Sequence, residues 1–216
     1  MIAARDFVFD LDNTLYPVST IYDAIGARMT AYIARALDVD EGEALTLRER
    51  YFHAYGATVS GLARHHGIDA HDFLADAHNV DYAALTPDAE LAALIARLPG
   101  RRIVFTNGGG GHGQRALARL GLAAHFERVF DLEDAGLTPK PERAAYERLI
   151  AACGIEPARA ILIEDTLKNL EPAHALGFAT VLIGPVHPAP GIGYVDHYAP
   201  ELKMFLRDWL LSHGGC

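Results

Sequence analysis

The sequence predicts an α/β fold in which a parallel sheet is covered by helices on both faces. Three observations predict it. Short hydrophobic runs that end in polar or turn-forming residues recur along the chain, amphipathic helical patterns separate them, and one long stretch, residues 17–85, contains no convincing strand. A connection between a strand and a helix usually needs only about 2–6 residues. We therefore interpret residues 17–85 as a helical insertion that forms a cap.

The expected strands share one form, a short apolar run followed by polar or turn-forming residues. The first, Phe7–Phe9, runs directly into Asp10 and Asp12. The others are residues 102–105 before Thr106-Asn107, 129–130 before Asp131, 160–163 before Glu164-Asp165 and 180–183 before Gly184-Pro185. Their length and their β-branched and aromatic content are typical of buried strands.

Apolar residues at helical spacing predict the helices between these strands. A helix is expected through Leu91–Leu98, with Thr86-Pro87 as its N-terminal cap. Further helices are expected at residues 116–120, ended by Gly121, at 146–153, ended by Gly154, and at 202–210. We therefore expect a core formed by residues 1–16 and 86–216, and a cap formed by residues 17–85.

Composition excludes several classes of protein. The 216 residues include 19 Lys and Arg against 28 Asp and Glu, a net charge of −9, whereas nucleic-acid polymers and anionic membranes bind basic surfaces. No apolar run approaches the ~20 residues that span a bilayer, and the N-terminus shows no signal peptide. The only cysteines, Cys153 and Cys216, are not expected to form a disulfide. We expect a cytoplasmic monomer or homodimer.

The polar residues after the strands are expected to lie together, because the carboxyl ends of parallel strands share one edge of the sheet. The carboxylates of Asp10, Asp12, Glu164 and Asp165 suit Mg²⁺. Residues 106–111, TNGGGG, offer a hydroxyl, an amide and free N–H groups to an anion. Lys140, fixed between two prolines, suits a phosphate or a carboxylate. Taken singly, each group also fits a solvated turn or an empty loop, with Asn169 as a helix cap.

In this order, these groups resemble the motifs of the haloacid dehalogenase-like hydrolase superfamily over essentially the whole chain. Residues 9–17, FDLDNTLYP, match the first motif, Thr106-Asn107 the second, Lys140 the third and Glu164-Asp165 the fourth. The resemblance implies a Rossmann-like three-layer core with an all-helical cap inserted after the first motif. Glu164 departs from the pair of aspartates that many members carry.

The resemblance also implies catalytic roles. Asp10 would be the nucleophile that forms an aspartyl-phosphate, and Asp12 would protonate the leaving oxygen and then activate water. Thr106 and Lys140 would hold the phosphoryl oxygens. Dehalogenating members generally lack an acid at the position of Asp12, which favours phosphate esters.

The same resemblance implies a cofactor and a phosphate cradle. Mg²⁺ would be bound by Asp10, the backbone carbonyl of Asp12 and Asp165, with Glu164 acting directly, through water or only as a charge. The backbone amides of Leu11, Asp12 and Asn107 would help to hold the phosphate.

Within the superfamily, the first motif and residues 51–66, 77–82 and 167–172 resemble the pyrimidine 5′-nucleotidase-like subgroup. The implied reaction converts UMP or CMP to a nucleoside and phosphate, with Thr58 and Arg64 as cap contacts. The cap tyrosines, Tyr22, Tyr32, Tyr51 and Tyr55, fit core positions better than base stacking. Alternatives are a sugar-phosphate or phosphoglycolate phosphatase, a phosphomutase, and a non-catalytic sensor of a phosphorylated ligand.

Overall fold

The structure is a computed structural model that describes residues 6–213. Within this range six parallel strands form one sheet in the order β3-β2-β1-β4-β5-β6. The strands are β1 (Asp6–Phe9), β2 (Arg101–Phe105), β3 (Arg128–Phe130), β4 (Ala160–Glu164), β5 (Ala179–Ile183) and β6 (His197–Ala199). From β1 the chain builds the sheet first toward β3 and then, starting with β4, in the opposite direction. In sheets of this kind, ligands bind at the carboxyl ends of the strands where the direction changes.

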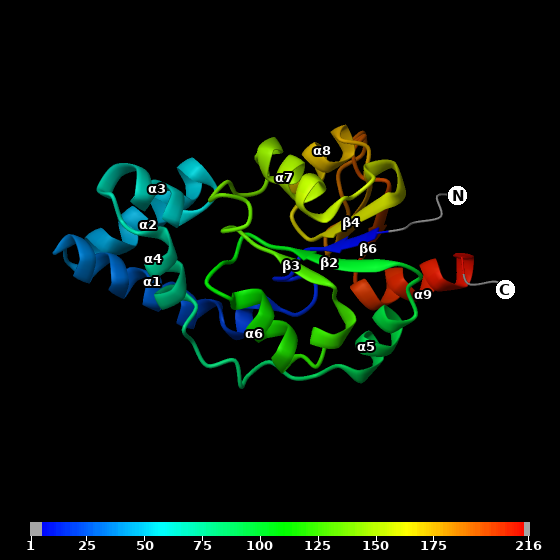
Figure 1. Ribbon diagram of the computed structural model, residues 1–216, viewed down its shortest axis with the longest axis horizontal. Helices are drawn as coiled ribbons and strands as arrows, with labels where there is room; N and C mark the ends of the chain where they lie inside the picture. The colour runs from blue at the N-terminus through cyan, green and yellow to red at the C-terminus, as the bar shows by residue number, and fades with distance from the viewer. Residues whose placement is uncertain (1–5, 214–216) are drawn as a thin grey trace.

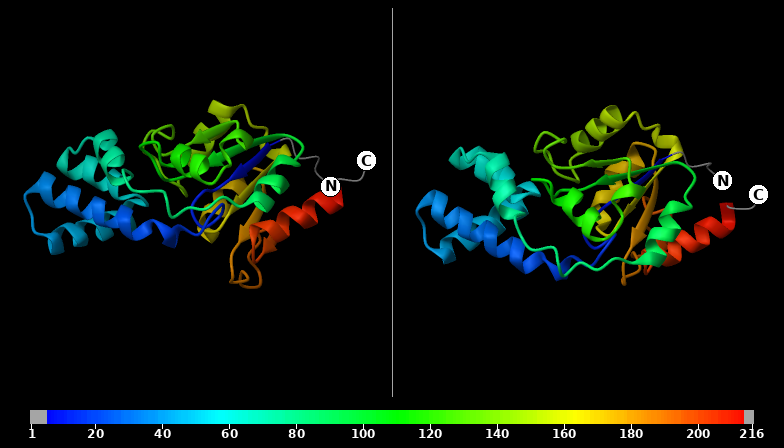
Figure 2. Two further views of the ribbon diagram at one scale, coloured as in Figure 1. Left: turned by 90° about the horizontal axis from the view of Figure 1, so that it is seen from below. Right: turned by 60° about the horizontal axis from the view of Figure 1, so that its bottom comes forward.

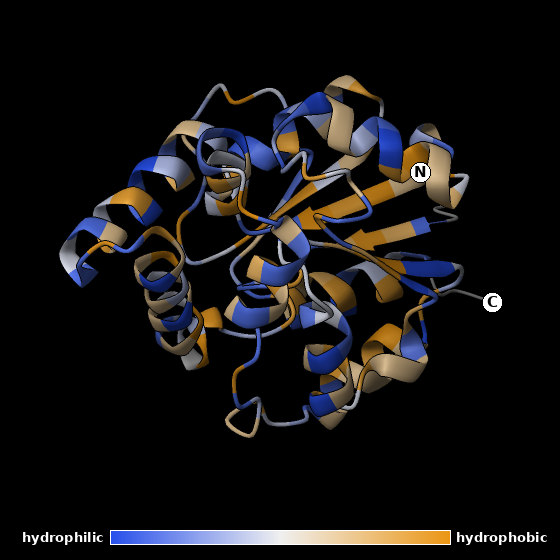
Figure 3. Cartoon of the chain, turned by 60° about the vertical axis from the view of Figure 1, so that its left-hand side comes forward, coloured by the Kyte–Doolittle hydropathy of each residue, from blue (hydrophilic) through white to orange (hydrophobic). Residues whose placement is uncertain are grey.

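Helices cover both faces of the sheet, so the core has three layers (Figure 1). One face packs against α5 (Ala89–Ala96), α6 (His112–Arg119) and α9 (Leu202–His213). The other packs against α7 (Arg143–Cys153) and α8 (Leu167–Ala175). The strands are mostly apolar, as their colour in Figure 3 shows, because both of their faces are buried. The expected Rossmann-like core is confirmed.

Four helices lie at one end of the sheet, in the stretch between β1 and β2 (Figures 1 and 2). They are α1 (Tyr22–Leu37), α2 (Glu41–Tyr55), α3 (Thr58–His66) and α4 (Ala70–Ala77). They share a cluster of buried side chains that includes Ile33, Leu62 and Phe73. At the ends of this stretch, Ile25 and Tyr82 pack instead with the side chains of the sheet. The division into a core of residues 1–16 and 86–216 and a cap of residues 17–85 stays a prediction.

Two local expectations were wrong. Thr86-Pro87 does not cap α5, because Asp88 precedes the helix and accepts hydrogen bonds from the amides of Glu90 and Leu91, both at 3.0 Å. Aspartate is the stronger capping residue of the two. Likewise, Asn169 is not a cap, since α8 begins at Leu167 and Asn169 is buried inside it.

No helix of residues 6–213 is long and apolar enough to cross a membrane. Cys153 is a free thiol. The expectation about a disulfide also concerns Cys216, and the expectation about a signal peptide concerns the first five residues. Both lie outside the described residues.

Candidate active site

The site is built where β1 and β4 end side by side. Phe9 of β1 pairs with Ile163 of β4, and the amide of Asp10 donates to the carbonyl of Ile163 at 2.9 Å. Asp10 follows β1 directly, and Glu164 is the last residue of β4. This register brings two carboxylates from distant parts of the sequence to neighbouring positions.

Lys140 joins these two carboxylates. Its Nζ atom donates to Asp10 Oδ1 at 2.6 Å, to Glu164 Oε1 at 2.8 Å and to the carbonyl of Phe105 at 2.8 Å. All three side chains are at most 9% exposed. Burial alone would lower the pKa of Lys140, but the two carboxylates outweigh it and raise that pKa, so the side chain stays an ammonium ion.

The side chain of Asn107 positions the backbone of Lys140. The Lys140 amide donates to Asn107 Oδ1 at 2.7 Å, and Asn107 Nδ2 donates to the Lys140 carbonyl at 3.1 Å. Sequence reasoning gave Asn107 a role only in holding an anion, through its carboxamide and its backbone amide. The structure adds a clamp that fixes the lysine before any substrate arrives.

The carboxylates of Asp10, Glu164 and Asp165 fit a divalent cation. One oxygen from each lies within 4.8 Å of the others, and Asp10 Oδ2 is buried without a hydrogen-bond partner. A buried carboxylate oxygen without a partner is costly, and an all-oxygen donor set suits Mg²⁺. Burial raises the pKa of Asp10 well above its usual range, an effect that Lys140 opposes. A bound cation would stabilise the ionised form.

Glu164 differs from the other two acids. Lys140 and Asn169 Nδ2 both donate to its Oε1, the latter at 2.5 Å, and the amide of Thr166 donates to its Oε2 at 2.6 Å. We therefore infer that Asp10 and Asp165 are the stronger metal ligands, and that Glu164 chiefly orients Lys140.

Mg²⁺ affinity is expected to fall about tenfold between pH 7 and pH 5. Burial, with Glu164 adding to it, raises the pKa of Asp165 to about 6. Its carboxyl is therefore mostly ionised at pH 7 and mostly protonated at pH 5, where protons compete with the cation. Titration calorimetry with MgCl₂ at both values measures this. Asp165→Asn should bind more weakly and lose most of the pH dependence; equal wild-type affinities at both values would contradict a ligand role for Asp165.

Backbone amides without partners among the described residues follow β1 and β2. Leu11 and Thr106 are buried, and Thr106 Oγ1 accepts from the amide of Gly108 at 2.9 Å. In the described part of the chain, no hydrogen bond is made by the backbone amides of Leu11, Asp12 and Asn107. A role for these three amides in holding phosphate stays a prediction.

The glycine run serves another purpose than the one expected from the sequence. The amide of Gly110 donates to Glu133 Oε2 at 2.5 Å, so a carboxylate of the same chain occupies this expected anion site. Gly110 also lies against α4, where an added Cβ would come within 2.5 Å of the carbonyl oxygen of Leu74. His71 of α4 pairs with the same Glu133. The run therefore joins the α1–α4 end of the molecule to the sheet.

Asp12 sits among groups that sequence reasoning missed. Its Oδ1 accepts from the hydroxyl of Tyr16 and lies 3.0 Å from Nε2 of His112. Burial tends to raise the pKa of Asp12, but the hydrogen bond and charge of His112 outweigh it, so that pKa lies below its usual value. No motif marked His112; its place directly after the glycine run was the only available signal.

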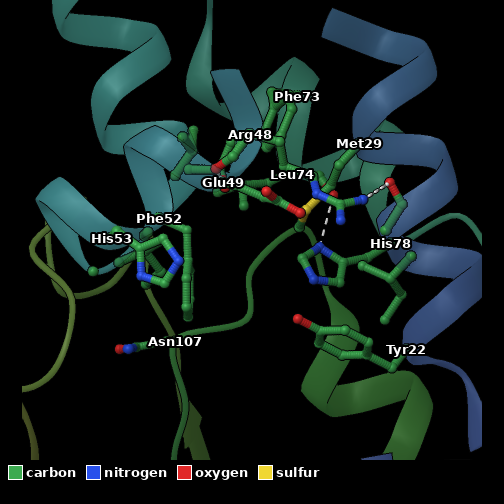
Figure 4. A pocket seen from close by; sticks show the side chains of 17 residues that line it. Tyr22, Met29, Arg48, Glu49, Phe52, His53, Phe73, Leu74, His78 and Asn107 are labelled. Carbon is green, nitrogen blue, oxygen red and sulfur yellow. Dashed lines mark hydrogen bonds between the residues drawn. The ribbon is translucent and has the colours of Figure 1, made fainter. Parts of the chain in front are cut away.

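A cavity of about 370 Å³ opens between α1–α4 and the core (Figure 4). Its wall reaches the core at Asn107 and Leu132. Thr58 lines it, and its hydroxyl donates to the carbonyl of Arg48 at 3.0 Å; contact of Thr58 with a substrate stays a prediction. The expectation for Arg64 was wrong, because that side chain is exposed, lies over the ring of Tyr55 and is not part of the wall.

Aromatic side chains line the same cavity. Tyr22 and Phe52 are 57% and 50% exposed, and both belong to its wall. The expectation that the cap tyrosines are core residues holds for Tyr51, which is buried, and is wrong for Tyr22. Glu49 and His53 add polar groups to the wall.

Two curated proteins are similar to this chain over most of its length. A phosphoglycolate phosphatase of Rhodospirillum rubrum is 31% identical over 230 residues, which covers 94% of this chain and 89% of that protein. Phosphate metabolism protein 8 of Saccharomyces cerevisiae is 29% identical over 202 residues, or 83% of this chain; the match spans only 61% of the length of that relative.

A solved structure shares the fold. L-2-haloacid dehalogenase from Xanthobacter autotrophicus, with chloropropionic acid covalently bound, superposes with a TM-score of 0.64 at 19% identity, covering 98% of this chain and 100% of that one. A family model described as haloacid dehalogenase-like hydrolase matches residues 7–177. This chain therefore belongs to the haloacid dehalogenase-like hydrolases.

Proposed function

We propose that this protein hydrolyses phosphate monoesters through a phosphorylated Asp10. The observation that carries the proposal is the way in which the two oxygens of the Asp10 carboxylate are held. Lys140 fixes its Oδ1 at 2.6 Å, and its Oδ2 is buried with no partner. A held carboxylate of this kind, beside free amide donors, is placed to attack a phosphorus atom.

The neighbouring groups supply the remaining steps. Lys140 and the free amides of Leu11, Asp12 and Asn107 attract the phosphoryl oxygens and stabilise their charge in the transition state. Asp12 gives a proton to the leaving oxygen and then takes one from the water that cleaves the acyl phosphate. Bound at Asp10 and Asp165, Mg²⁺ would supply positive charge opposite the phosphoryl group.

Two features favour a phosphate ester over an organic halide. A halide leaves without a proton, so C–halogen cleavage needs no acid beside the nucleophile, yet Asp12 is present and held by two hydrogen-bond donors. The Rhodospirillum rubrum relative is also a phosphatase. A non-catalytic sensor transfers no proton to a leaving group, so Asp12 would be superfluous there as well.

We further propose a pyrimidine nucleoside monophosphate as substrate. A cavity of about 370 Å³ is at the small end of ligand pockets, which suits one ring and a sugar. The exposed rings of Tyr22 and Phe52 offer apolar faces that a base can use. Phosphoglycolate or a sugar phosphate, the second candidate, presents no aromatic face; the name of the Rhodospirillum rubrum relative favours it.

Phosphate release from a panel of esters tests both proposals. The panel holds UMP, CMP, AMP, GMP, phosphoglycolate, sugar phosphates and p-nitrophenyl phosphate, each with Mg²⁺ and with EDTA. We expect activity that EDTA removes, with UMP and CMP preferred. Phe52→Ala should raise KM for UMP about tenfold and leave KM for p-nitrophenyl phosphate within about threefold.

Leu45→Ala is the matched control, because Leu45 is also exposed on α2 but lies outside the cavity. A preference for phosphoglycolate or a sugar phosphate would overturn the substrate while keeping the chemistry. No turnover of any ester by folded, Mg²⁺-loaded protein would overturn the chemistry as well.

A further inference from the structure

The buried ring of His112 is held at both nitrogens. Its Nε2 lies 3.0 Å from Asp12 Oδ1, and its Nδ1 lies 2.8 Å from the hydroxyl of Tyr82. His112 is the first residue of α6, and its side chain is 1% exposed. The ring therefore connects the loop after β1 with the segment that returns from α4 to the core.

The contact with Asp12 defines the hydrogen at one ring nitrogen. An ionised carboxylate only accepts, so Nε2–H of His112 donates to Asp12. On the other side of the ring, the Tyr82 hydroxyl lies 2.8 Å from Nδ1 and donates to the carbonyl of His78 at 3.2 Å. Contacts at both nitrogens hold the ring in one orientation, with Nε2–H directed at the acid.

Packing fixes the ring as well. A Cβ added at Gly108 would lie 2.7 Å from Cδ2 of His112, so the ring fills the space that this glycine leaves. On another side the ring of His78 lies 4.8 Å away, centre to centre. Burial lowers the pKa of His78 to about 4, so this neighbour is neutral near pH 7 and does not repel the donor.

We propose that His112 is a positioning residue that holds the Asp12 carboxylate where it exchanges protons with the leaving oxygen and with water. This inference rests on the proposed function. The side chain of Asp12 is 29% exposed, and His112 holds its Oδ1 together with the hydroxyl of Tyr16. Proton transfer needs the two heavy atoms within about 2.6–3.2 Å, and a displacement of about 1 Å can cost a hundredfold in rate. His112 acts only through Asp12.

The test compares leaving groups. An alkyl phosphate needs a proton on its leaving oxygen, whereas p-nitrophenolate leaves without one. The ratio of kcat/KM for UMP, or for the best alkyl ester of the panel, to kcat/KM for p-nitrophenyl phosphate therefore reports proton donation. This ratio excludes the later hydrolysis of the acyl phosphate, which follows departure of the leaving group.

We expect His112→Leu to lower this ratio about 10- to 100-fold with little change in KM. His112→Gln, whose amide can still donate toward Asp12, should keep the ratio within about threefold of wild type. In an Asp12→Asn background, His112→Leu should change the ratio by less than about twofold, because both substitutions remove the same function.

An equal loss for both esters, or a full additional loss in the Asp12→Asn background, would overturn the proposal. If His112→Leu does not fold, His112→Asn replaces it: its shorter amide does not reach Asp12, and the ratio must still fall below that of His112→Gln. Failure of the proposed function gives a different result, since the wild-type protein would then turn over neither ester.

Discussion

Asp10→Asn is expected to lower kcat for every phosphate ester by at least about 10⁴-fold. The amide keeps the size of the carboxylate but is no nucleophile, and the remaining groups can bind the ester without cleaving it. Initial rates with Mg²⁺ over the ester panel measure the loss. Glu171→Gln, at an exposed acid of α8, is the control and should keep wild-type rates. An Asp10→Asn protein within tenfold of wild type would contradict the nucleophilic role.

Lys140→Met is expected to have the second-largest effect, a loss of about 10³-fold in kcat/KM. Methionine keeps the length of the stem and removes the charge that holds Asp10 and Glu164. It also leaves two buried carboxylates without the ammonium group that pairs with them. This loss is expected to destabilise the fold by about 3–5 kcal/mol at neutral pH.

The pH dependence of this variant follows from the same contacts. Without the ammonium group, burial and the charge of Glu164 raise the carboxyl pKa of Asp10 in the folded state above that of the unfolded chain, with no cation to oppose them. The penalty is therefore present above the folded pKa and is relieved as the pH falls through it. Thermal melts of Lys140→Met should approach wild type at pH 5 and fall furthest below it at pH 8. Lys168→Met, at an exposed lysine, is the control. A constant deficit in melting temperature would contradict the charge-based explanation.

Much of the sheet could be predicted because its signals are local. Each of the five expected strands is a short apolar run followed by polar or turn-forming residues, and each is present within a residue or two. The sixth, β6, is only His197–Ala199; it lies at the edge of the sheet, so it carries no continuous apolar run. The cap of α5 was misplaced because Thr86-Pro87 and Asp88 are competing signals two residues apart.

The side-chain partners in the site could be predicted only where the resemblance marked them. The register of β1 and β4 brings Asp10 and Glu164 together, and Lys140 donates to both. By contrast, the clamp of Asn107 on Lys140 and the contact of His112 with Asp12 join residues 33 and 100 positions apart. Arg64 was assigned to the substrate from its charge alone, and a helix face toward solvent cannot be distinguished from a face toward a cavity by charge.

The most direct test is to trap the covalent intermediate on Asp10. Protein mixed with Mg²⁺ and its best ester is quenched within milliseconds, reduced with borohydride and digested, and the peptide containing Asp10 is identified by mass. An aspartyl-phosphate is reduced to homoserine, so we expect homoserine at position 10 in the wild-type protein with ester, and in neither the ester-free sample nor Asp10→Asn. Rapid turnover with an unmodified Asp10 peptide at every quench time would contradict the account, because water would then attack the phosphate directly.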